Sequence, residues 1–166
     1  MGFSDRAVPM RAAALRLRER RDELARLMAM EMGKPFAQGQ AEADKCAWVC
    51  EYFAEHAESF LRPESVETDA LRSYVAHRPL GVILAVMPWN FPLWQVFRCV
   101  APGLMAGNAI VLKHASNVSG CALAIEEILG EAGFPGGLFR ALLVESRVVA
   151  PIIEDPRIRA VTLTGS

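Results

Sequence analysis

The chain has 166 residues, of which 52% are hydrophobic, and its formal net charge at pH 7 is −1. This hydrophobic content excludes an intrinsically disordered protein, and the length suffices for one domain with its own core. The small net charge, and the lack of a basic stripe interleaved with aromatic residues, argue against nucleic acid or acidic lipid as a partner.

Charge is unevenly spread, because residues 1–80 hold 12 of the 18 lysines and arginines and 13 of the 19 acidic residues. We therefore expect solvated amphipathic helices first and a more buried sheet after them. The N-terminus lacks the apolar core of a signal peptide, and the longest apolar run, residues 80–87, is too short to cross a membrane. These features predict a cytoplasmic protein with no membrane partner.

Two helices are expected in the first part of the chain, over residues 5–32 and 39–61. In both, apolar residues recur at the i, i+3, i+4 spacing of an amphipathic helix. Gly33 and Pro35 end the first helix, and Pro63 follows the second. We expect an antiparallel helical pair over residues 1–62. The stretch 71–77 could form a short strand or arm.

From Pro79 onward, β- and α-type patterns alternate. Strands are expected over residues 81–87, 109–113, 138–144 and 159–164, with helices over 93–105, 118–131 and 146–154 between them. This alternation predicts an α/β fold, a partial Rossmann-like, doubly wound parallel sheet over residues 79–166. In such sheets ligands bind beyond the carboxyl ends of the strands. Four polar segments occupy those positions: Trp89-Asn90, Lys113 to Ser116, Glu145-Ser146 and Gly165-Ser166.

The last expected strand runs into Gly165-Ser166 with nothing after it. A doubly wound domain rarely stops at its ligand edge, so we expect residues 1–166 to be an incomplete domain.

The segment Pro-Trp-Asn-Phe-Pro at 88–92 follows the first buried strand. Its two prolines restrict the backbone on either side of Asn90. An asparagine amide in a rigid loop can donate to a developing oxyanion. The alternative is a turn asparagine that helps to cap the helix beginning near Leu93, and the loop alone favours this alternative.

Lys113 is the only lysine or arginine between Arg98 and Arg140, and it ends an apolar strand. A lysine there suits a ligand phosphate or ribose hydroxyl, and a solvated lysine at a strand exit is the equal alternative. Backbone amides at Gly165-Ser166 could meet a pyrophosphate. Neither a G-x-G-x-x-G fingerprint after a strand nor a P-loop motif occurs.

The cysteines do not suggest a nucleophile or a metal site. Their spacing fits neither a secreted disulfide framework nor a zinc site, and all four fall within apolar helical patterns: Cys46, Cys50, Cys99 and Cys121. We expect buried packing thiols and no bound metal. A metal pair at Cys46 and Cys50 has the i, i+4 spacing but no supporting histidines.

Taken together, the motifs resemble the aldehyde dehydrogenase superfamily along nearly the whole chain. The similar segments, in the family's order, are EMGKP at 31–35, GVILAVMPWNFP at 81–92, AGN at 106–108, LK at 112–113, EAGFP at 131–135 and LTGS at 163–166. The stretch 114–139 is most similar to bacterial succinate-semialdehyde dehydrogenases. The resemblance identifies the chain as the N-terminal, cofactor-binding part of such an enzyme.

The resemblance implies roles for six residues. Asn90 would donate its amide to the oxyanion of the thiohemiacetal, and Trp89 with Asn90 would line the channel between cofactor and substrate. Lys113 would bind the adenosine ribose, and Gly165-Ser166 would face the pyrophosphate. Ser116 stands where many NAD-specific members carry glutamate, whose charge would repel a 2′-phosphate. The implied cofactor is therefore NAD or NADP, with NADP tolerated.

The resemblance also implies what is missing. Glu145 stands where relatives commonly have glycine, and His114 replaces a frequent proline. The general-base glutamate, the nucleophilic cysteine and the oligomerisation region would lie beyond residue 166. The implied parent is a homo-oligomeric enzyme that oxidises a small aldehyde, with succinate semialdehyde the leading substrate. The alternative is an inactive remnant that at most binds nucleotide or associates with other chains.

Overall fold

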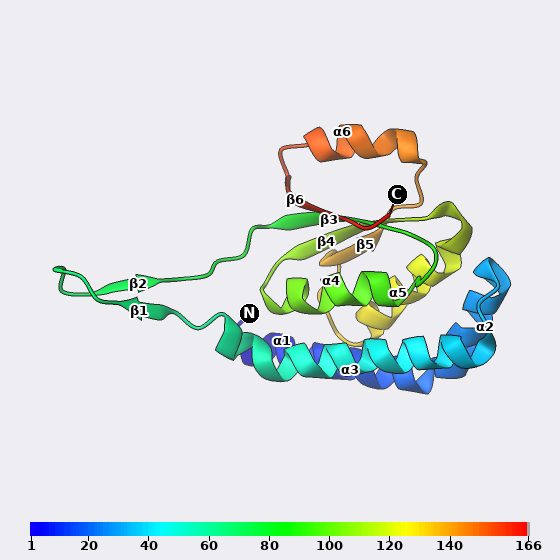
Figure 1. Ribbon diagram of the computed structural model, residues 1–166, viewed down its shortest axis with the longest axis horizontal. Helices are drawn as coiled ribbons and strands as arrows, with labels where there is room; N and C mark the ends of the chain where they lie inside the picture. The colour runs from blue at the N-terminus through cyan, green and yellow to red at the C-terminus, as the bar shows by residue number, and fades with distance from the viewer. Residues whose placement is uncertain (166) are drawn as a thin grey trace.

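A computed structural model describes residues 1–165, and its elements stack in layers (Figure 1). Three N-terminal helices form the outermost layer on one side. Two further helices lie between them and a four-stranded parallel sheet, and one short helix lies on the opposite face of that sheet. The predicted fold class, a partial doubly wound α/β sheet preceded by helices, is confirmed.

The N-terminal layer contains one helix more than the sequence indicates. The expected first helix is divided into α1 (Phe3–Glu19) and α2 (Arg21–Met32), and α3 (Phe36–Phe60) follows. Neither glycine nor proline stands at the division. Arg20 lies there, and its guanidinium reaches Glu23 at 2.6 Å and Glu127 at 2.8 Å. Gly33 ends α2 in a left-handed conformation, as expected of a helix C-cap.

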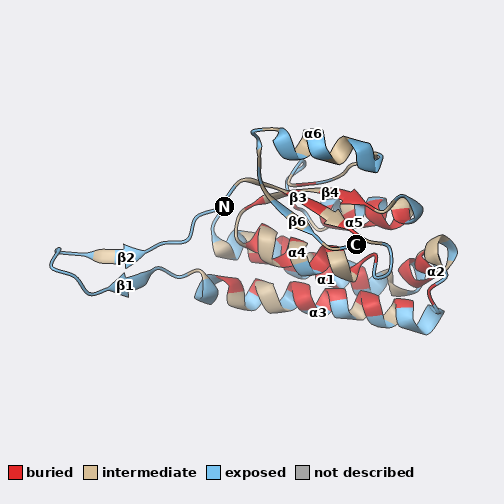
Figure 2. Cartoon of the chain, turned by 45° about the horizontal axis from the view of Figure 1, so that its top comes forward, coloured by how far each residue is buried: buried red, intermediate tan, exposed pale blue. Residues whose placement is uncertain are grey.

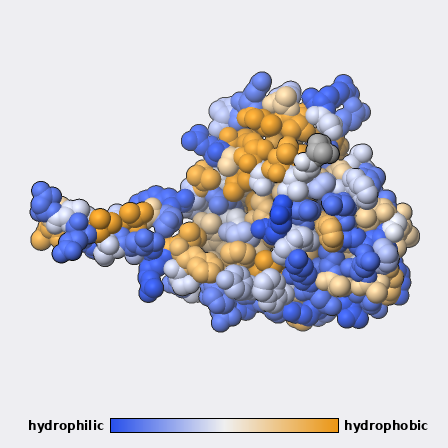
Figure 3. Space-filling view, in the orientation of Figure 1, coloured by the Kyte–Doolittle hydropathy of each residue, from blue (hydrophilic) through white to orange (hydrophobic). Residues whose placement is uncertain are grey.

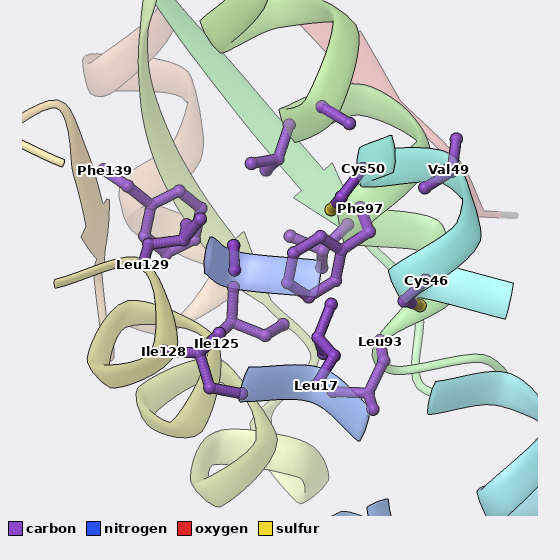
Figure 4. Close-up of a cluster of buried hydrophobic side chains, with 14 of the residues drawn as sticks. Leu17, Cys46, Val49, Cys50, Leu93, Phe97, Ile125, Ile128, Leu129 and Phe139 are labelled. Carbon is purple, nitrogen blue, oxygen red and sulfur yellow. The ribbon is translucent and has the colours of Figure 1, made fainter. Parts of the chain in front are cut away.

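The core lies between these helices and the sheet, and Figure 4 shows part of it. Leu17 of α1, Cys46 of α3, Phe97 and Ile125 meet there, and all four are fully buried. Burial of a leucine or phenylalanine side chain contributes about 1.5–3 kcal/mol relative to exposure. Apolar packing therefore joins the helical layer to the sheet layer.

A two-stranded hairpin projects from the body between the helices and the sheet (Figures 1 and 2). β1 (Glu64–Val66) pairs antiparallel with β2 (Ser73–Val75), with Ser65 opposite Tyr74. The expected arm at 71–77 contains β2, whereas β1 has no sequence signal. Nearly every residue of the hairpin is exposed, as the pale blue in Figure 2 shows.

The sheet has the order β5-β4-β3-β6, and every neighbouring pair is parallel. Its strands are β3 (Val82–Met87), β4 (Ala109–His114), β5 (Phe139–Ala141) and β6 (Ile158–Leu163). β5 is shorter than the expected strand 138–144. β6 is half exposed, in contrast to the more buried sheet expected from the sequence, because it is an edge strand that pairs only with β3 among the described residues.

Helices cover the two faces of the sheet unequally. The face toward the N-terminal layer carries α4 (Trp94–Met105), the 3₁₀ turn η1 (Ser116–Val118) and α5 (Ser119–Glu131). Among residues 1–165, the other face carries only η2 (Ser146–Val148) and α6 (Val149–Glu154), which have no buried residue. Apolar side chains consequently remain visible around β6 and α6, as the orange area in Figure 3 shows; Val161 and Leu163 are exposed.

Candidate functional site

The carboxyl edge of the sheet brings the predicted site segments together. β3 lies between β4 and β6, and its register pairs Met87 with His114 and Val86 with Leu163. Because the three strands are parallel, the segments that follow them leave from the same edge. The chain proceeds from β3 to β4 and β5 on one side and returns to β6 on the other. This reversal is the topological switch point at which doubly wound sheets bind ligands.

Asn90 lies in the loop 88–92 that follows β3. Its side chain is exposed, and Trp89 beside it is half exposed. The expected alternative, that Asn90 caps the next helix, is not what the structure shows, because the first amides of α4 are bound by Glu42 of α3. Glu42 Oε1 accepts hydrogen bonds from the backbone N–H of Leu93 and of Trp94, each at 2.9 Å. The Asn90 amide is therefore left for another partner.

Glu42 belongs to a buried ion pair that fixes the loop 88–92 from the side of the N-terminal helices. Its Oε2 contacts the ammonium of Lys34, and the two side chains are 2% and 5% exposed. The Lys34 ammonium also lies 3.9 Å from the ring centroid of Phe91, a cation–π contact. One carboxylate thus satisfies a buried cation and the positive end of a helix at once. Through Lys34 and Glu42, the EMGKP segment and α3 fix the loop that carries Asn90.

Glu31 performs the equivalent task at the next helix. Its Oε1 accepts from the backbone N–H of Gly120 at 2.6 Å, and its Oε2 from that of Cys121 at 2.9 Å. A Cβ at position 120 would lie 2.9 Å from Glu31 Oε1 and 3.0 Å from Leu27 Cδ1, so a larger residue there would displace the end of the Glu31 side chain from its present position. The N-terminus of α5, like that of α4, is capped by a carboxylate of the N-terminal layer.

Lys113 is the next-to-last residue of β4, and Ser116 follows the strand. Ser116 and His114, the neighbour of Lys113, line a cavity of about 180 Å³. The cavity is lined by residues 114–116, Ser119 and residues 142–145. Lys113 is 8% exposed, and its ammonium donates to Ser146 Oγ at 3.3 Å. No ion pair of Lys113 occurs within residues 1–165. A buried, singly bonded ammonium beside a cavity is suited to a hydroxyl or anionic ligand.

Glu145 lines the same cavity, as its sequence position suggested. Its Oε2 accepts from Arg147 Nε at 2.6 Å, and both side chains are largely exposed. The adjacent guanidinium offsets the carboxylate charge toward a ligand, although solvent screening makes such an exposed pair weak.

At the end of β6, Thr164 donates its backbone N–H to Val86 O at 3.0 Å, which keeps the segment against β3. Gly165 follows and is exposed; Ser166 lies outside the described residues. Arg98 of α4 reaches the same place, because its Nη2 donates to Thr164 Oγ1 at 2.5 Å. Arg98 is exposed and forms no ion pair among residues 1–165. The carboxyl edge therefore carries a second unpaired cation.

None of the four thiols is activated as a nucleophile, which would require a lowered pKa. Burial raises the pKa of Cys46, Cys50, Cys99 and Cys121, and the nearby carboxylate of Glu31 raises that of Cys121 further. Within the described range no group of three or more histidine, cysteine or acidic residues is placed to hold a metal ion. Among the same residues, no helix has the length and apolar character needed to span a membrane.

Sequence reasoning missed three residues at this edge. Glu31 and Glu42 lie on helices distant in the sequence, and only the packing reveals that they cap α4 and α5. Arg98 had a local signal, because it is the only charged residue in α4.

The family assignment follows from comparison with known proteins. A model described as the aldehyde dehydrogenase family matches residues 1–166. The chain belongs to the aldehyde dehydrogenase family. A probable succinate-semialdehyde dehydrogenase (NADP(+)) of Synechocystis sp. is 57% identical over 164 residues, and succinate-semialdehyde dehydrogenase (NADP(+)) 1 of Mycobacterium tuberculosis is 50% identical over 167. Each alignment covers 99% of the chain and 36% of the relative.

A solved structure gives the same assignment at the level of the fold. The chain superimposes with a TM-score of 0.95 on succinic semialdehyde dehydrogenase from Streptococcus pyogenes, crystallised with NADP+, at 40% identity. The match covers 99% of this aldehyde dehydrogenase chain and 36% of the other. The chain thus spans about a third of the length of these relatives, and the predicted superfamily membership is confirmed.

Proposed function

We propose that this chain forms the cofactor-binding edge of an aldehyde dehydrogenase that oxidises succinate semialdehyde to succinate with NADP+. The observation that carries the proposal is the convergence at one sheet edge of an exposed asparagine amide and a buried lysine beside a cavity. The NADP-dependent succinate-semialdehyde dehydrogenases named above, at 57% and 50% identity, support the substrate and cofactor class.

Asn90 is assigned to the reacting carbonyl. When a nucleophile adds to an aldehyde, negative charge develops on the carbonyl oxygen, and a fixed amide donor stabilises that charge. Trp89 lies beside Asn90 and is assigned to the wall between cofactor and substrate. The support is that Glu42 and Lys34 fix the loop while the Asn90 side chain makes no hydrogen bond among the described residues.

Lys113 and Ser116 are assigned to the adenosine ribose, and Gly165 with Ser166 to the pyrophosphate. The cofactor supplies the hydride acceptor for the oxidation. The cavity beside Lys113 fits this assignment, because its polar lining includes Ser116 and because Arg147 offsets the charge of Glu145. A serine at position 116 does not repel a 2′-phosphate, which favours acceptance of NADP as well as NAD.

Arg98 is assigned to the substrate carboxylate. Succinate semialdehyde carries a carboxylate at the end opposite its aldehyde, so its site needs a cation at the edge that holds Asn90. Arg98 projects there from α4 and contacts Thr164 at the end of β6. A guanidinium binds a carboxylate through two parallel hydrogen bonds.

The whole enzyme is proposed to be a cytoplasmic homo-oligomer. Four free cysteines fit a reducing compartment. The projecting hairpin exposes Val66, Tyr74 and Val75, and assembly would cover such apolar surface.

Calorimetric titration of the chain with NADP+ and with NAD+ tests the cofactor assignment. Lys113→Ala should weaken NADP+ binding at least tenfold, since a hydrogen bond to a charged group contributes about 1.5–3 kcal/mol. Arg72→Ala in the hairpin removes the same charge far from the edge and should leave binding unchanged. Ser116→Glu should weaken NADP+ more than NAD+. Equal NADP+ affinity for Lys113→Ala and the unmodified chain would remove the assignment.

A further inference from the structure

We propose that His114 is a positioning residue that ties the loop 88–92 to the turn 114–116, and thereby sets Asn90 relative to the ribose site. The ligands of the loop 88–92 and of the turn 114–116 are those of the proposed function, and the inference rests on that function in this respect alone. The connection itself rests on the hydrogen bonds of a single buried ring.

His114 is the last residue of β4 and is 5% exposed. Its Nε2 lies 2.9 Å from the carbonyl oxygen of Pro92, and its Nδ1 accepts from the backbone N–H of Ala115 at 2.9 Å. A carbonyl can only accept and an amide N–H can only donate, so the two contacts specify one tautomer. The hydrogen is on Nε2, and Nδ1 is the acceptor.

A third contact distinguishes the neutral ring from the charged ring. Nδ1 also lies 3.3 Å from the carbonyl oxygen of Met87, the last residue of β3. A proton on Nδ1 would be donated to this oxygen, and the Ala115 N–H would lose its acceptor. The neutral Nε2–H ring therefore joins the loop 88–92, through Pro92 O, to the turn 114–116, through the Ala115 N–H. It makes no hydrogen bond to Met87 O, and the charged ring would release the turn that leads to Ser116.

The surroundings keep the ring neutral. Burial lowers the pKa of His114, and the positive charge of Lys113 on the same strand acts in the same direction. The carbonyl groups of Pro92 and Met87 and the carboxylate of Glu31 on α2 oppose this shift but do not outweigh it.

The loop needs such a connection because prolines stand at both its ends. Pro88 and Pro92 have no backbone N–H to donate, so the loop depends on acceptors and side chains for its attachment. Glu42 holds the residues that follow it, and Lys34 lies over Phe91. His114 is the contact from the cofactor side of the edge.

Two substitutions separate the two hydrogen bonds in the 166-residue chain. In His114→Gln the side-chain N–H₂ can reach Pro92 O as Nε2 does, but Ala115 loses its acceptor. In His114→Asn the side-chain oxygen can replace Nδ1, but Pro92 loses its donor. His56→Asn on α3 is the matched control, because the ring of that histidine hydrogen-bonds to Tyr52 O and stacks on Tyr52 and Phe60, all within its own helix.

¹⁵N NMR relaxation provides a readout that needs no nucleotide. In His114→Asn, the order parameter of the Asn90 backbone amide should fall from a rigid value of about 0.85 to below about 0.6, with the Ala115 amide unchanged. In His114→Gln, exchange of the Ala115 amide should become at least tenfold faster while Asn90 stays ordered. The ring of the unmodified protein should show Nε2–H and no charge at pH 7.

An unchanged Asn90 order parameter in His114→Asn, or an Nδ1–H ring in the unmodified chain, would overturn the proposal. The tautomer of His114 is measured on the unmodified chain, so this test does not depend on the folding of a variant. NADP+ affinity is then measured on the same proteins, and His114→Gln should bind about tenfold more weakly. If the unmodified chain binds no NADP+, the proposed function fails, whereas the positioning role is decided by the NMR result alone.

Discussion

The buried pair of Lys34 and Glu42 gives the sharpest test of how the N-terminal layer supports the edge. Glu42→Gln keeps an oxygen for the amides of Leu93 and Trp94 but removes the charge that neutralises Lys34. Breaking a buried pair on one side costs about 3–5 kcal/mol, because the remaining charge has no partner. Since the free energy of unfolding of a domain is about 5–15 kcal/mol, this loss should be a large fraction of the total stability.

Urea denaturation followed by circular dichroism measures the change. Lys34→Met combined with Glu42→Gln removes both charges and should recover at least about 2 kcal/mol of the loss. Glu42→Ala, which also leaves two amides without an acceptor, should lose more than Glu42→Gln by about 1–3 kcal/mol for each amide. A loss below about 1 kcal/mol in Glu42→Gln would show that the pair is solvated, and the reasoning about a buried cap would be wrong.

Three further results are expected. Glu31→Ala should destabilise the chain by about 1–2 kcal/mol, because Gly120 and Cys121 lose their cap; an unchanged urea midpoint would contradict this. Because the pKa of His114 is lowered in the folded chain, the unfolded chain binds the proton more readily. The contribution of neutral His114 to the free energy of unfolding is therefore complete above pH 6.5 and declines below it, by at most about 1.4 kcal/mol per pH unit. His114→Gln should flatten this decline, and identical pH profiles would exclude the effect. Finally, the 166-residue chain should not form NADPH from succinate semialdehyde, because burial raises the pKa of all four thiols. Slow alkylation of the thiols at pH 7 would support this reason, and NADPH formation by the chain would refute the prediction.

Local patterns sufficed to predict the sheet and its covering helices. The apolar runs at 81–87 and 109–113 became β3 and β4 with one-residue shifts, because a strand buried between helices needs continuous apolar residues. Gly33 marked a helix end for the same kind of local reason. β1 was not predicted, since its exposed residues show no alternation, and the division at Arg20 has neither glycine nor proline to mark it.

The site was predictable only where its residues follow strands. Asn90 and Lys113 come directly after apolar runs, and parallel strands carry such residues to one edge. Glu42 could not be predicted, because its partners Leu93 and Trp94 lie about 50 residues further along the chain. A carboxylate on an amphipathic helix is ordinarily solvated, and only tertiary packing makes it a cap.

The two carboxylate caps also bear on how the chain folds. Glu31 binds amides 89 and 90 positions ahead in the sequence, so the carboxylate cap of α5 forms only when the N-terminal layer has docked. Contacts of such long range slow folding, and their loss opens a region cooperatively. Any fluctuation that lifts this layer from α4 and α5 would therefore also loosen the nucleotide edge, although no residue of that layer has been assigned to the ligand.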